Sequence, residues 1–414
     1  MTEPQVSYAN PKTLPPISLP PGITSRYLDC SPSSLIFHIL ESGRPPPGES
    51  KPLILLMHGF PELAYSWRQI MPQLAQQDPG YHVVAMDQRG YGRTHHPDHP
   101  QAIPSDTFRP TTLIKDTLHI VTALGYSSAA CIAGHDFGAV TATLCALSRP
   151  DIFRSCCLLS HPFKGAPTLN YVTPKPPPIN METALRGLSP PRKHYKWYYC
   201  TPPANADMTF PTGIPLHTFL RGYFHLKSGD WAPNTPHALS GWHVSELAKM
   251  PRYYIMDADC GMRENVARDM SSCDLPEVRR KSARWLNDTE LQVYVDEYGR
   301  NGFQGGLNWY RIQTQGGFLS DYEIWSGMRI EVPLAFVAGV KDWGTFQEPG
   351  AVEALESGRA VRKDLYRGTH LVEGAGHWVT QEQPKECVRV IARLAREALG
   401  QAEEGDSGIG RNKI

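Results

Sequence analysis

The chain has 414 residues, and its 41 lysines and arginines equal its 41 aspartates and glutamates, so that its formal net charge is zero. A chain without net charge creates no long-range field that would draw it to nucleic acid or to an anionic membrane, which argues against both as partners. Its polar, proline-rich start (residues 1–21) lacks the pattern of a secretion signal, and no apolar run approaches the roughly 18 residues that cross a membrane.

Two buried strands are predicted in the first quarter of the chain. Residues 52–57 form a short apolar run of the kind found in parallel strands that are covered on both faces. The sequence His-Gly-Phe-Pro-Glu follows at once, at 58–62. Residues 81–87 form the second strand and lead into a charged, glycine-rich turn at 89–93. Strands that alternate with helices in this way predict a parallel sheet with helices on both faces.

The most informative segment is the sequence Cys-Ile-Ala-Gly-His-Asp-Phe-Gly at 131–138. It runs from an apolar strand through a turn flanked by glycines into a helix predicted over residues 139–147. This pattern is typical of a nucleophile elbow, but its tip carries Asp136 where most enzymes with such a turn carry serine. An aspartate is ionised at neutral pH, so it can attack an sp3 carbon without a base and form an alkyl ester, whereas serine serves acyl transfer. The alternative interpretation of Asp136 is an ordinary helix N-cap, a position that Asp favours.

Two backbone N–H groups near this turn are candidates for an oxyanion hole. Phe137, the residue after the predicted nucleophile, supplies one of them. Phe60, in the loop after the first buried strand, supplies the other. A pair of such donors stabilises the negative oxygen that develops when a carbonyl is attacked.

The other catalytic groups are expected downstream, because this kind of fold places nucleophile, acid and histidine in that chain order. Residues 332–339 form a predicted buried strand, and Asp342 lies in the loop after it, where catalytic groups sit in open α/β sheets. Asp342 is therefore the predicted orienting acid. The predicted general base is His377, which follows a further strand and a glycine and precedes a helix predicted over 384–399. Its rival among the 16 histidines is the nearby His370.

Several of these motifs together resemble those of the epoxide hydrolases of the soluble type, which have the α/β-hydrolase fold. The likeness rests on His-Gly-Phe-Pro-Glu with Tyr-Ser-Trp-Arg at 65–68, on Gly-His-Asp-Phe-Gly at 134–138 and on Gly-His-Trp at 376–378, and it spans the core almost from end to end. It implies a mostly parallel, doubly wound sheet with an inserted, mostly helical cap. The expected parts are a disordered tail (1–22), the first part of the core (23–161), the cap (162–328), the second part of the core (329–400) and a second disordered tail (401–414).

The resemblance also implies two cap tyrosines that donate to the epoxide oxygen. The segment 302–311 closely resembles the family's cap segment that ends in a catalytic tyrosine, which makes Tyr310 the first predicted donor. The second lies early in the cap, where Tyr195 fits best and Tyr198 and Tyr199 compete with it. The predicted substrate pocket includes His58, Pro61, Trp309 and Trp378.

The implied mechanism has two steps. Asp136 attacks an epoxide carbon while a tyrosine protonates the oxygen. His377, held in one tautomer by Asp342, then activates a water that attacks the ester carbonyl, and a vicinal diol leaves. No metal and no cofactor is required. The predicted partner is a small molecule, a bulky apolar epoxide, because the cap is rich in aromatic residues. The identity and stereochemistry of this epoxide and the oligomeric state of the chain stay open.

Some positions differ from the family's usual pattern. The residue after the nucleophile is often tryptophan there, whereas this chain has Phe137. Haloalkane dehalogenases share the aspartate nucleophile but typically hold the halide with a tryptophan N–H at that position, and phenylalanine has no such donor. The cap is also long, and its extra material near residues 209–273 has no assigned role. Three alternatives stay open: a dehalogenase-like hydrolase, an epoxide-opening cyclase or isomerase of secondary metabolism, and a non-catalytic binding protein on the same fold.

Cysteines and the C-terminus bear on where the protein is found. Nine cysteines, several of them in core-like runs, fit reduced intracellular thiols better than a disulfide framework, so a cytoplasmic location is expected. The last three residues, Asn-Lys-Ile at 412–414, resemble a degenerate peroxisomal Ser-Lys-Leu address, which keeps the peroxisome open as an alternative. The run Lys-Pro-Pro-Pro at 175–178 is typical of a linker.

Overall fold

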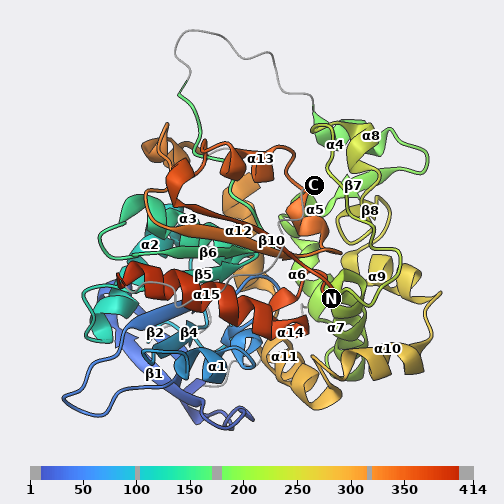
Figure 1. Ribbon diagram of the computed structural model, residues 1–414. Coiled ribbons are helices and arrows are strands. Elements are labelled where there is room, and N and C mark those ends of the chain that lie inside the picture. Colours follow the sequence, from blue (N-terminus) through green and yellow to red (C-terminus); the bar gives the residue numbers. More distant parts are fainter. Residues whose placement is uncertain (1–10, 98–102, 170–179, 315–318, 401–414) are drawn as a thin grey trace.

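An eight-stranded sheet forms the centre of the computed structural model, which describes residues 11–97, 103–169, 180–314 and 319–400 (Figure 1). The strand order is β1-β2-β4-β3-β5-β6-β9-β10. Strand β2 pairs antiparallel with β1 and β4, and the remaining pairs are parallel. The strands are β1 (Thr24–Cys30), β2 (Leu35–Ser42), β3 (Leu53–Met57), β4 (His82–Met86), β5 (Cys131–His135), β6 (Cys156–Leu159), β9 (Leu334–Gly339) and β10 (Tyr366–Val372).

Helices cover both faces of this sheet. On one face, Leu55 and Val84 belong to an apolar cluster with side chains of α2, α3 and α13; on the other, Ile54 and Val83 belong to a cluster with side chains of α1 and α15, which crosses in front of the sheet in Figure 1. Strands β3, β4 and β5 are buried along their whole length, as expected of parallel strands between two helical layers. The core helices are α1 (Met71–Ala75), α2 (Pro110–Ala123), α3 (Phe137–Ser148), α13 (Ala351–Glu356), α14 (Val379–Glu382) and α15 (Pro384–Ala398).

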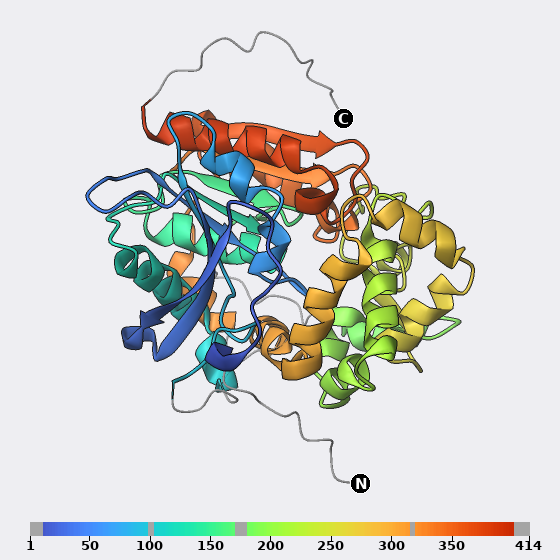
Figure 2. The same ribbon diagram turned by 90° about the horizontal axis from the view of Figure 1, so that it is seen from below.

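The segment between β6 and β9 is mostly helical and forms a second part of the molecule, and its helices α4 to α10 lie to one side of the sheet in the ribbon views (Figures 1 and 2). It also contains the short antiparallel strands β7 (Arg192–His194) and β8 (Ile255–Asp257). The cap helices are α4 (Met181–Arg186), α5 (Tyr195–Tyr199), α6 (Pro203–Thr209), α7 (Ile214–Lys227), α8 (Val244–Leu247), α9 (Met262–Met270), α10 (Leu275–Ser282), α11 (Asp288–Asn301) and α12 (Gln304–Thr314).

Short stretches of 3-10 helix complete the described elements. They are η1 (Pro11–Thr13), η2 (Ser31–Ser33), η3 (Ala64–Trp67), η4 (Ser105–Phe108), η5 (Leu319–Trp325), η6 (Trp343–Thr345) and η7 (Lys363–Leu365). None of the helices in the described ranges combines the length and the hydropathy that a membrane crossing needs.

The predicted fold class is confirmed. The strands predicted at 52–57, 81–87 and 332–339 correspond to β3, β4 and β9, and the helix predicted at 384–399 corresponds to α15. The helix predicted from residue 139 begins two residues earlier, because Phe137 and Gly138 already belong to the first turn of α3. Strands β1 and β2 were not predicted, and neither was the β7–β8 pair in the cap.

The tail predicted to be disordered over 1–22 is described from residue 11 onward. There Ile17 and Leu19 pack against an apolar cluster, and the Tyr27 hydroxyl donates to the Pro11 carbonyl at 2.5 Å. Apolar side chains thus attach this stretch to the body of the molecule. The remainder of that tail, the tail 401–414 with its residues 412–414, and the predicted linker 175–178 lie outside the described residues.

The loops that leave the carboxyl ends of the parallel strands meet the cap. Asp136 directly follows β5, Asp342 follows β9 and His377 follows β10. Phe60, Phe137, Trp343 and Trp378 from these loops share one buried cluster with side chains of the cap helices. The fold therefore brings three residues that are distant in the chain to one edge of the sheet, beneath the cap.

Candidate active site

Asp136 lies at the tip of a sharp turn between β5 and α3. Its backbone has φ 52° and ψ −116°, a region that residues with a side chain rarely adopt. Its amide donates to the Leu159 carbonyl at 3.0 Å, which ties the turn to β6. Two glycines permit the close packing: a Cβ on Gly134 would lie 2.0 Å from the carbonyl oxygen of Gly138, and a Cβ on Gly138 would lie 1.9 Å from that of Met57.

The Asp136 carboxylate accepts a hydrogen bond from a neighbouring loop and not from the helix that follows it. Asp136 occupies the N-cap position of α3, yet its side chain caps none of the described N–H groups of that helix. Its Oδ1 instead accepts the backbone N–H of Phe60 at 3.0 Å. The N-cap interpretation therefore fails for this side chain. The other predicted donor, the Phe137 N–H, opens α3, where the first backbone N–H groups have no acceptor within the helix.

His377 lies between two carboxylates. Its Nδ1 is 3.0 Å from Asp342 Oδ1, and its Nε2 is 3.6 Å from Asp136 Oδ2. Asp342 also accepts the N–H of Gly344 at 2.7 Å, which fixes the carboxylate that faces the ring. The Nε2 atom is buried and has no hydrogen-bond partner among the described residues. With Nδ1–H donated to Asp342, Nε2 is an unoccupied proton acceptor beside Asp136.

The electrostatics keep Asp136 ionised and His377 neutral at pH 7. Burial opposes ionisation of Asp136, but the positive charges of His377 and Lys227 and the hydrogen bond from Phe60 outweigh it and lower its pKa to about 2. Burial and the Lys227 ammonium lower the pKa of His377 from its usual value of 6.5, against the opposing effect of Asp342. Burial opposes ionisation of Asp342 as well, and the charge and hydrogen bond of His377 hold its pKa below the usual value.

Two cap tyrosines lie beside this turn. The Tyr310 ring, on α12, contacts the rings of Phe137 and Phe60 with centroid distances of 4.4 and 5.4 Å, and the Tyr195 ring, on α5, lies 5.7 Å from it. Burial raises the pKa of both phenols well above the usual value of 10, and the negative charge of Asp136 raises it further. Both side chains are therefore protonated donors at neutral pH. The Tyr195 hydroxyl donates to Gln347 Oε1 at 3.4 Å.

The competing residues make other contacts. The Tyr198 hydroxyl donates to Asp207 at 2.6 Å, within the cap. The Tyr199 ring does lie 4.9 Å from that of Tyr310, but its hydroxyl pairs with the Tyr223 hydroxyl at 3.3 Å. His370 lies on β10, where its Nε2 is 3.2 Å from a backbone carbonyl oxygen of the same strand. Among the three tyrosines left open by the sequence, Tyr195 is the one whose pKa the charge of Asp136 raises, and between the two histidines it is His377 that lies 3.6 Å from the Asp136 carboxylate.

The four residues predicted to line the substrate pocket are held by different contacts. Both ring nitrogens of His58 bond to backbone groups, at 2.9 and 3.1 Å, so this side chain holds its loop and has no ring nitrogen left for a substrate. Pro61 is buried and follows a cis peptide bond. Trp309 and Trp378 donate their indole N–H groups to backbone carbonyls, at 3.1 and 2.7 Å, and turn their rings to Phe137 and His377.

A buried glutamate that the sequence reasoning missed holds the His377 loop. Oε1 of Glu382 accepts the backbone N–H groups on either side of His377, from Gly376 at 3.0 Å and from Trp378 at 3.1 Å. Its Oε2 accepts the N–H of Gly229, in the cap, at 2.7 Å. Burial raises the pKa of Glu382 to about 8 in spite of these three donors. One side chain thus connects the loop of the predicted base to the cap.

A second unpredicted pair links three loops behind the site. Glu62 Oε2 lies 2.5 Å from His135 Nδ1 and accepts the N–H of Gly59 at 2.9 Å. His135 Nε2 in turn lies 2.6 Å from the carbonyl oxygen of His377. Burial disfavours a charged His135, but the Glu62 carboxylate outweighs it and raises the pKa of His135 to about 9. Both residues lie within motifs that the sequence analysis had singled out for their neighbours.

Lys227 is the third unpredicted group. It ends α7, and its carbonyl accepts the backbone N–H of His377 at 2.8 Å. It belongs to the extra cap segment, residues 209–273, to which the sequence gave no role. A lysine at the end of an amphipathic helix is usually exposed, so its sequence position carried no sign of a buried site.

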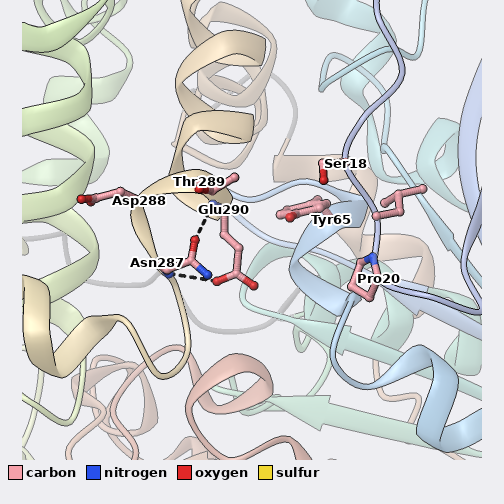
Figure 3. Close-up of a pocket in the computed structure, with 8 residues that line it drawn as sticks. Ser18, Pro20, Tyr65, Asn287, Asp288, Thr289 and Glu290 are labelled. Atoms are coloured by element: carbon pink, nitrogen blue, oxygen red, sulfur yellow. Dashed lines mark hydrogen bonds between the residues drawn. The ribbon is translucent and has the colours of Figure 1, made fainter.

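Two further observations concern what else the chain could bind. Across the described residues, no group of three or more His, Cys, Asp or Glu side chains is arranged to hold a metal ion. A surface hollow of about 430 Å³ lies between residues 18–20, Tyr65 and the start of α11 (Figure 3). Its main polar groups serve the helix: Asn287 and Glu290 form a reciprocal capping box, drawn as dashed lines there. The hollow therefore offers no catalytic grouping.

Comparison with known proteins gives a consistent set of relatives. Residues 52–193 match the family described as alpha/beta hydrolase fold. Epoxide hydrolase A of Mycobacterium tuberculosis is 33% identical over 373 residues, which cover 89% of this chain and 96% of that protein. Epoxide hydrolase B of the same organism is 30% identical over 84% of this chain and 92% of that protein. The solved structure of an epoxide hydrolase from an endophytic Streptomyces superposes with a TM-score of 0.70 at 27% identity, over 93% of this chain and 98% of that one.

Proposed function

Because this chain is a hydrolase that belongs to the epoxide hydrolase family, we propose that it opens an epoxide to a vicinal diol through a covalent ester on Asp136. The position of one carboxylate carries the mechanism. Oδ1 of Asp136 is 3.0 Å from the Phe60 nitrogen, whereas Oδ2 is 3.6 Å from His377 Nε2. One oxygen thus faces a fixed donor and the other faces the base.

In the first step, Oδ2 of Asp136 attacks an epoxide carbon and the carbon–oxygen bond of the ring breaks. The electron pair passes to the epoxide oxygen, which takes a proton from Tyr310 or Tyr195. Hydrogen bonds from two buried phenols stabilise the negative charge as it develops on that oxygen, which is general acid catalysis at the leaving group. The products of this step are a hydroxyalkyl ester and a phenolate that regains its proton later.

In the second step, His377 Nε2 takes a proton from a water molecule, and the hydroxide attacks Cγ of Asp136. Asp342 accepts the Nδ1–H and stabilises the imidazolium. The negative oxygen of the tetrahedral intermediate is Oδ1, which already accepts the Phe60 N–H. Collapse of the intermediate releases the diol, whose oxygen takes the proton from His377. The new carboxyl group then loses its proton, which returns to the tyrosine phenolate, and the Asp136 carboxylate is restored with one oxygen from water.

Dehalogenation is the less favoured reaction because the indole N–H groups near Asp136 are already used. Those of Trp309 and Trp378 donate to backbone carbonyls, and Phe137 has no side-chain donor. A departing halide would gain little from two phenols, since it needs no proton.

The test is the isolation of the ester. We expect His377→Gln to accumulate an adduct equal in mass to the whole epoxide when it is exposed to a panel of epoxides, and the additional change Asp136→Ala to abolish that adduct. A single turnover of the unmodified enzyme in H2(18)O should place heavy oxygen in the peptide that contains Asp136. An adduct formed instead from haloalkanes, with loss of the halogen, would support the dehalogenase. A folded His377→Gln variant that forms no adduct with either panel would contradict the two-step mechanism.

The remaining assignments follow the same proposal. We infer one hydrolase domain, residues 23–161 and 329–400, with residues 162–328 as its cap. All nine cysteines are free thiols, which supports a reducing compartment such as the cytoplasm. A small organic epoxide is the proposed substrate.

A further inference from the structure

Lys227 is a buried cation in an aromatic surrounding. The residue is only 4% exposed. Four ring centroids lie near its Nζ: Tyr254 at 5.1 Å, Trp378 at 5.3 Å, Tyr223 at 5.4 Å and Tyr253 at 6.0 Å. Ring faces attract a cation, which explains how the ammonium tolerates this position. They do not replace the hydrogen bonds that three N–H donors make in water.

No carboxylate among the described residues forms an ion pair with the Lys227 ammonium. Across the described part of the chain, Lys227 Nζ makes neither a hydrogen bond nor an ion pair. The other buried cations near the site do have such partners: Arg68 pairs with Glu290, and His135 pairs with Glu62. A buried charge without hydrogen bonds is costly. The three N–H donors of Lys227 are therefore available to a ligand.

The N–H donors of Lys227 lie near the proposed catalytic groups. Lys227 interacts electrostatically with Asp136 and His377, and Trp378, one of the rings around it, directly follows His377. Another of these rings, Tyr254, lies 5.2 Å from the ring of Tyr195. The Tyr254 hydroxyl is buried and has no partner among the described residues. Two donors of the cap without a hydrogen-bond partner among the described residues, the Lys227 ammonium and the Tyr254 hydroxyl, therefore lie near the predicted epoxide site.

The negative charge that compensates Lys227 moves during the reaction. In the free enzyme it lies on Asp136. Formation of the ester neutralises Asp136 and transfers the charge to the phenolate of Tyr310 or Tyr195. A negative group on the substrate would stay beside the ammonium throughout both steps, and it would accept hydrogen bonds from the N–H groups of Lys227.

We propose that Lys227 is a specificity-determining residue that binds a carboxylate of the substrate, with the Tyr254 hydroxyl as a second donor, so that the enzyme prefers epoxides that carry an acid group. This inference rests on the proposed function, whose reacting groups it extends. It gives the extra cap segment a role and replaces the expectation of a wholly apolar substrate by one with an apolar body and one anionic end.

The first experiment measures binding without any reaction. Straight-chain alkanoates from butanoate to decanoate and their primary amides would be titrated calorimetrically into the full-length enzyme. We expect at least one alkanoate to bind about tenfold or more tightly than its amide, because hydrogen bonds to a charged group are worth roughly that factor. Lys227→Met, which keeps the apolar stem, should abolish the preference, and Lys227→Arg should retain most of it.

The second experiment measures turnover. Terminal epoxy-alkanoates of the same lengths and their primary amides would be compared by kcat/KM. We expect the acid-to-amide ratio to fall about tenfold or more in Lys227→Met, mainly through KM. The matched control is Lys193→Met, which removes another cap lysine from a tyrosine ring, that of Tyr198, 4.6 Å from its Nζ. In this control the ratio should be unchanged.

The outcomes separate this inference from the proposed function. Alkanoates that bind no better than amides, or a preference that survives in Lys227→Met, would overturn the inference, even if every epoxide is converted to its diol. A wild-type enzyme that converts no epoxide while its alkanoate binding depends on Lys227 would overturn the proposed function and leave the anion site standing. Lys227→Arg keeps the charge, so it decides the matter if Lys227→Met is poorly folded.

Discussion

Asp136 has a strained backbone and a carboxylate that is ionised in a buried site. A residue with a side chain in such a backbone conformation costs about 1–3 kcal/mol and persists only where its surroundings hold it. Here the hydrogen bond from the Asp136 amide to β6 and the close packing of two glycines hold this conformation. This conformation places the carboxylate beside the loop of Phe60 and beside His377, the proposed base, which is the position that attack on a substrate carbon would require.

The roles of the two tyrosines lead to a first prediction. Tyr310→Phe or Tyr195→Phe should each slow ester formation about tenfold, and the double variant should slow it by about a hundredfold or more, because general acid catalysis at the epoxide oxygen is lost. The rate of adduct formation in the His377→Gln background measures this step directly. Tyr198→Phe is the control, because the Tyr198 hydroxyl is bonded to Asp207. If Tyr198→Phe has the larger effect, the assignment of the second donor is wrong.

The lowered pKa of His377 leads to a prediction for pH. His377 accepts a proton only when it is neutral, so the rate of ester hydrolysis should rise with pH through an inflection below 6.5 and then stay level until Glu382, which holds the His377 loop, titrates with a pKa of about 8; the tyrosine pKa values lie well above 10. The same depressed pKa means that the unfolded chain binds the proton more tightly, so stability falls as the pH drops below 6.5. Single-turnover hydrolysis between pH 4.5 and 9 measures the profile. A rising limb with its inflection above 7 would contradict it.

The sequence could predict some of these residues and not others. Asp136, Asp342 and His377 are recognisable because each lies in a loop after a strand, two of them beside glycines that mark a tight turn. Lys227 has no such local sign, because its role comes from contacts with a segment more than a hundred residues away. Glu382 lies in a helix whose sequence does not show that the carboxylate turns back to the N–H groups of Gly376 and Trp378. His58 shows the opposite error: it lies in a conspicuous motif, yet its ring serves only the backbone.

At the scale of elements, the loop between β10 and α14 depends on Glu382. Glu382→Gln should lower kcat about ten- to a hundredfold with little change in KM, because the amide nitrogen that replaces one carboxylate oxygen cannot accept an N–H, and a displaced His377 would take the proton from water in the wrong geometry. The free energy of unfolding should fall by about 1–3 kcal/mol.

The pH profile of ester hydrolysis distinguishes this positioning role from simple destabilisation, because only a displaced His377 shifts the inflection. The control is Glu386→Gln, at the start of α15, where the side chain is exposed and pairs with Arg389. A Glu382→Gln variant with normal kcat and an unchanged inflection would show that the three backbone bonds do not position the base.

The elements themselves were predicted best where the pattern was local. β3, β4, β9 and α15 are continuous apolar or amphipathic runs with clear stop signals. β1 was missed because its side chains mix exposed and buried positions without a clean alternation, and its antiparallel pairing with β2 departs from the alternating strand–helix pattern. The short β7–β8 pair joins segments of the cap that are distant in the chain, so no local signal could reveal it.

At the scale of the whole molecule, Arg68 joins the core to the cap. Its guanidinium donates to Glu290 at 2.9 Å, to Gln381 at 2.6 Å and to the Trp285 carbonyl at 2.8 Å, so that one buried cation connects η3, α14 and the start of α11. Such a centre holds the cap over the loops that carry the proposed catalytic groups. Its sequence position, within the motif at 65–68, gave no sign of this role.

Replacement of Arg68 should therefore loosen the whole assembly. Arg68→Met should lower the free energy of unfolding by about 2–4 kcal/mol, since buried acceptors lose their donor, with a discount for the partly exposed Glu290. Denaturant unfolding measures it, and hydrogen exchange should show faster opening of α11. Arg149→Met, at an exposed pair with Asp151, should change stability by less than about 0.5 kcal/mol. Equal effects of the two changes would contradict a linking role for Arg68.

The insertion of the cap between β6 and β9 has a consequence for synthesis of the protein. These two strands pair directly, although the whole cap lies between them in the chain, so β6 keeps an open edge on the ribosome until the cap has emerged, on the order of ten seconds later. During that interval the nascent chain holds Asp136 but neither Asp342 nor His377. It has the proposed nucleophile before it has the cap tyrosines that would assist the first step or the residues that would complete the second, so a chain cut short in the cap would carry Asp136 without the groups of either step.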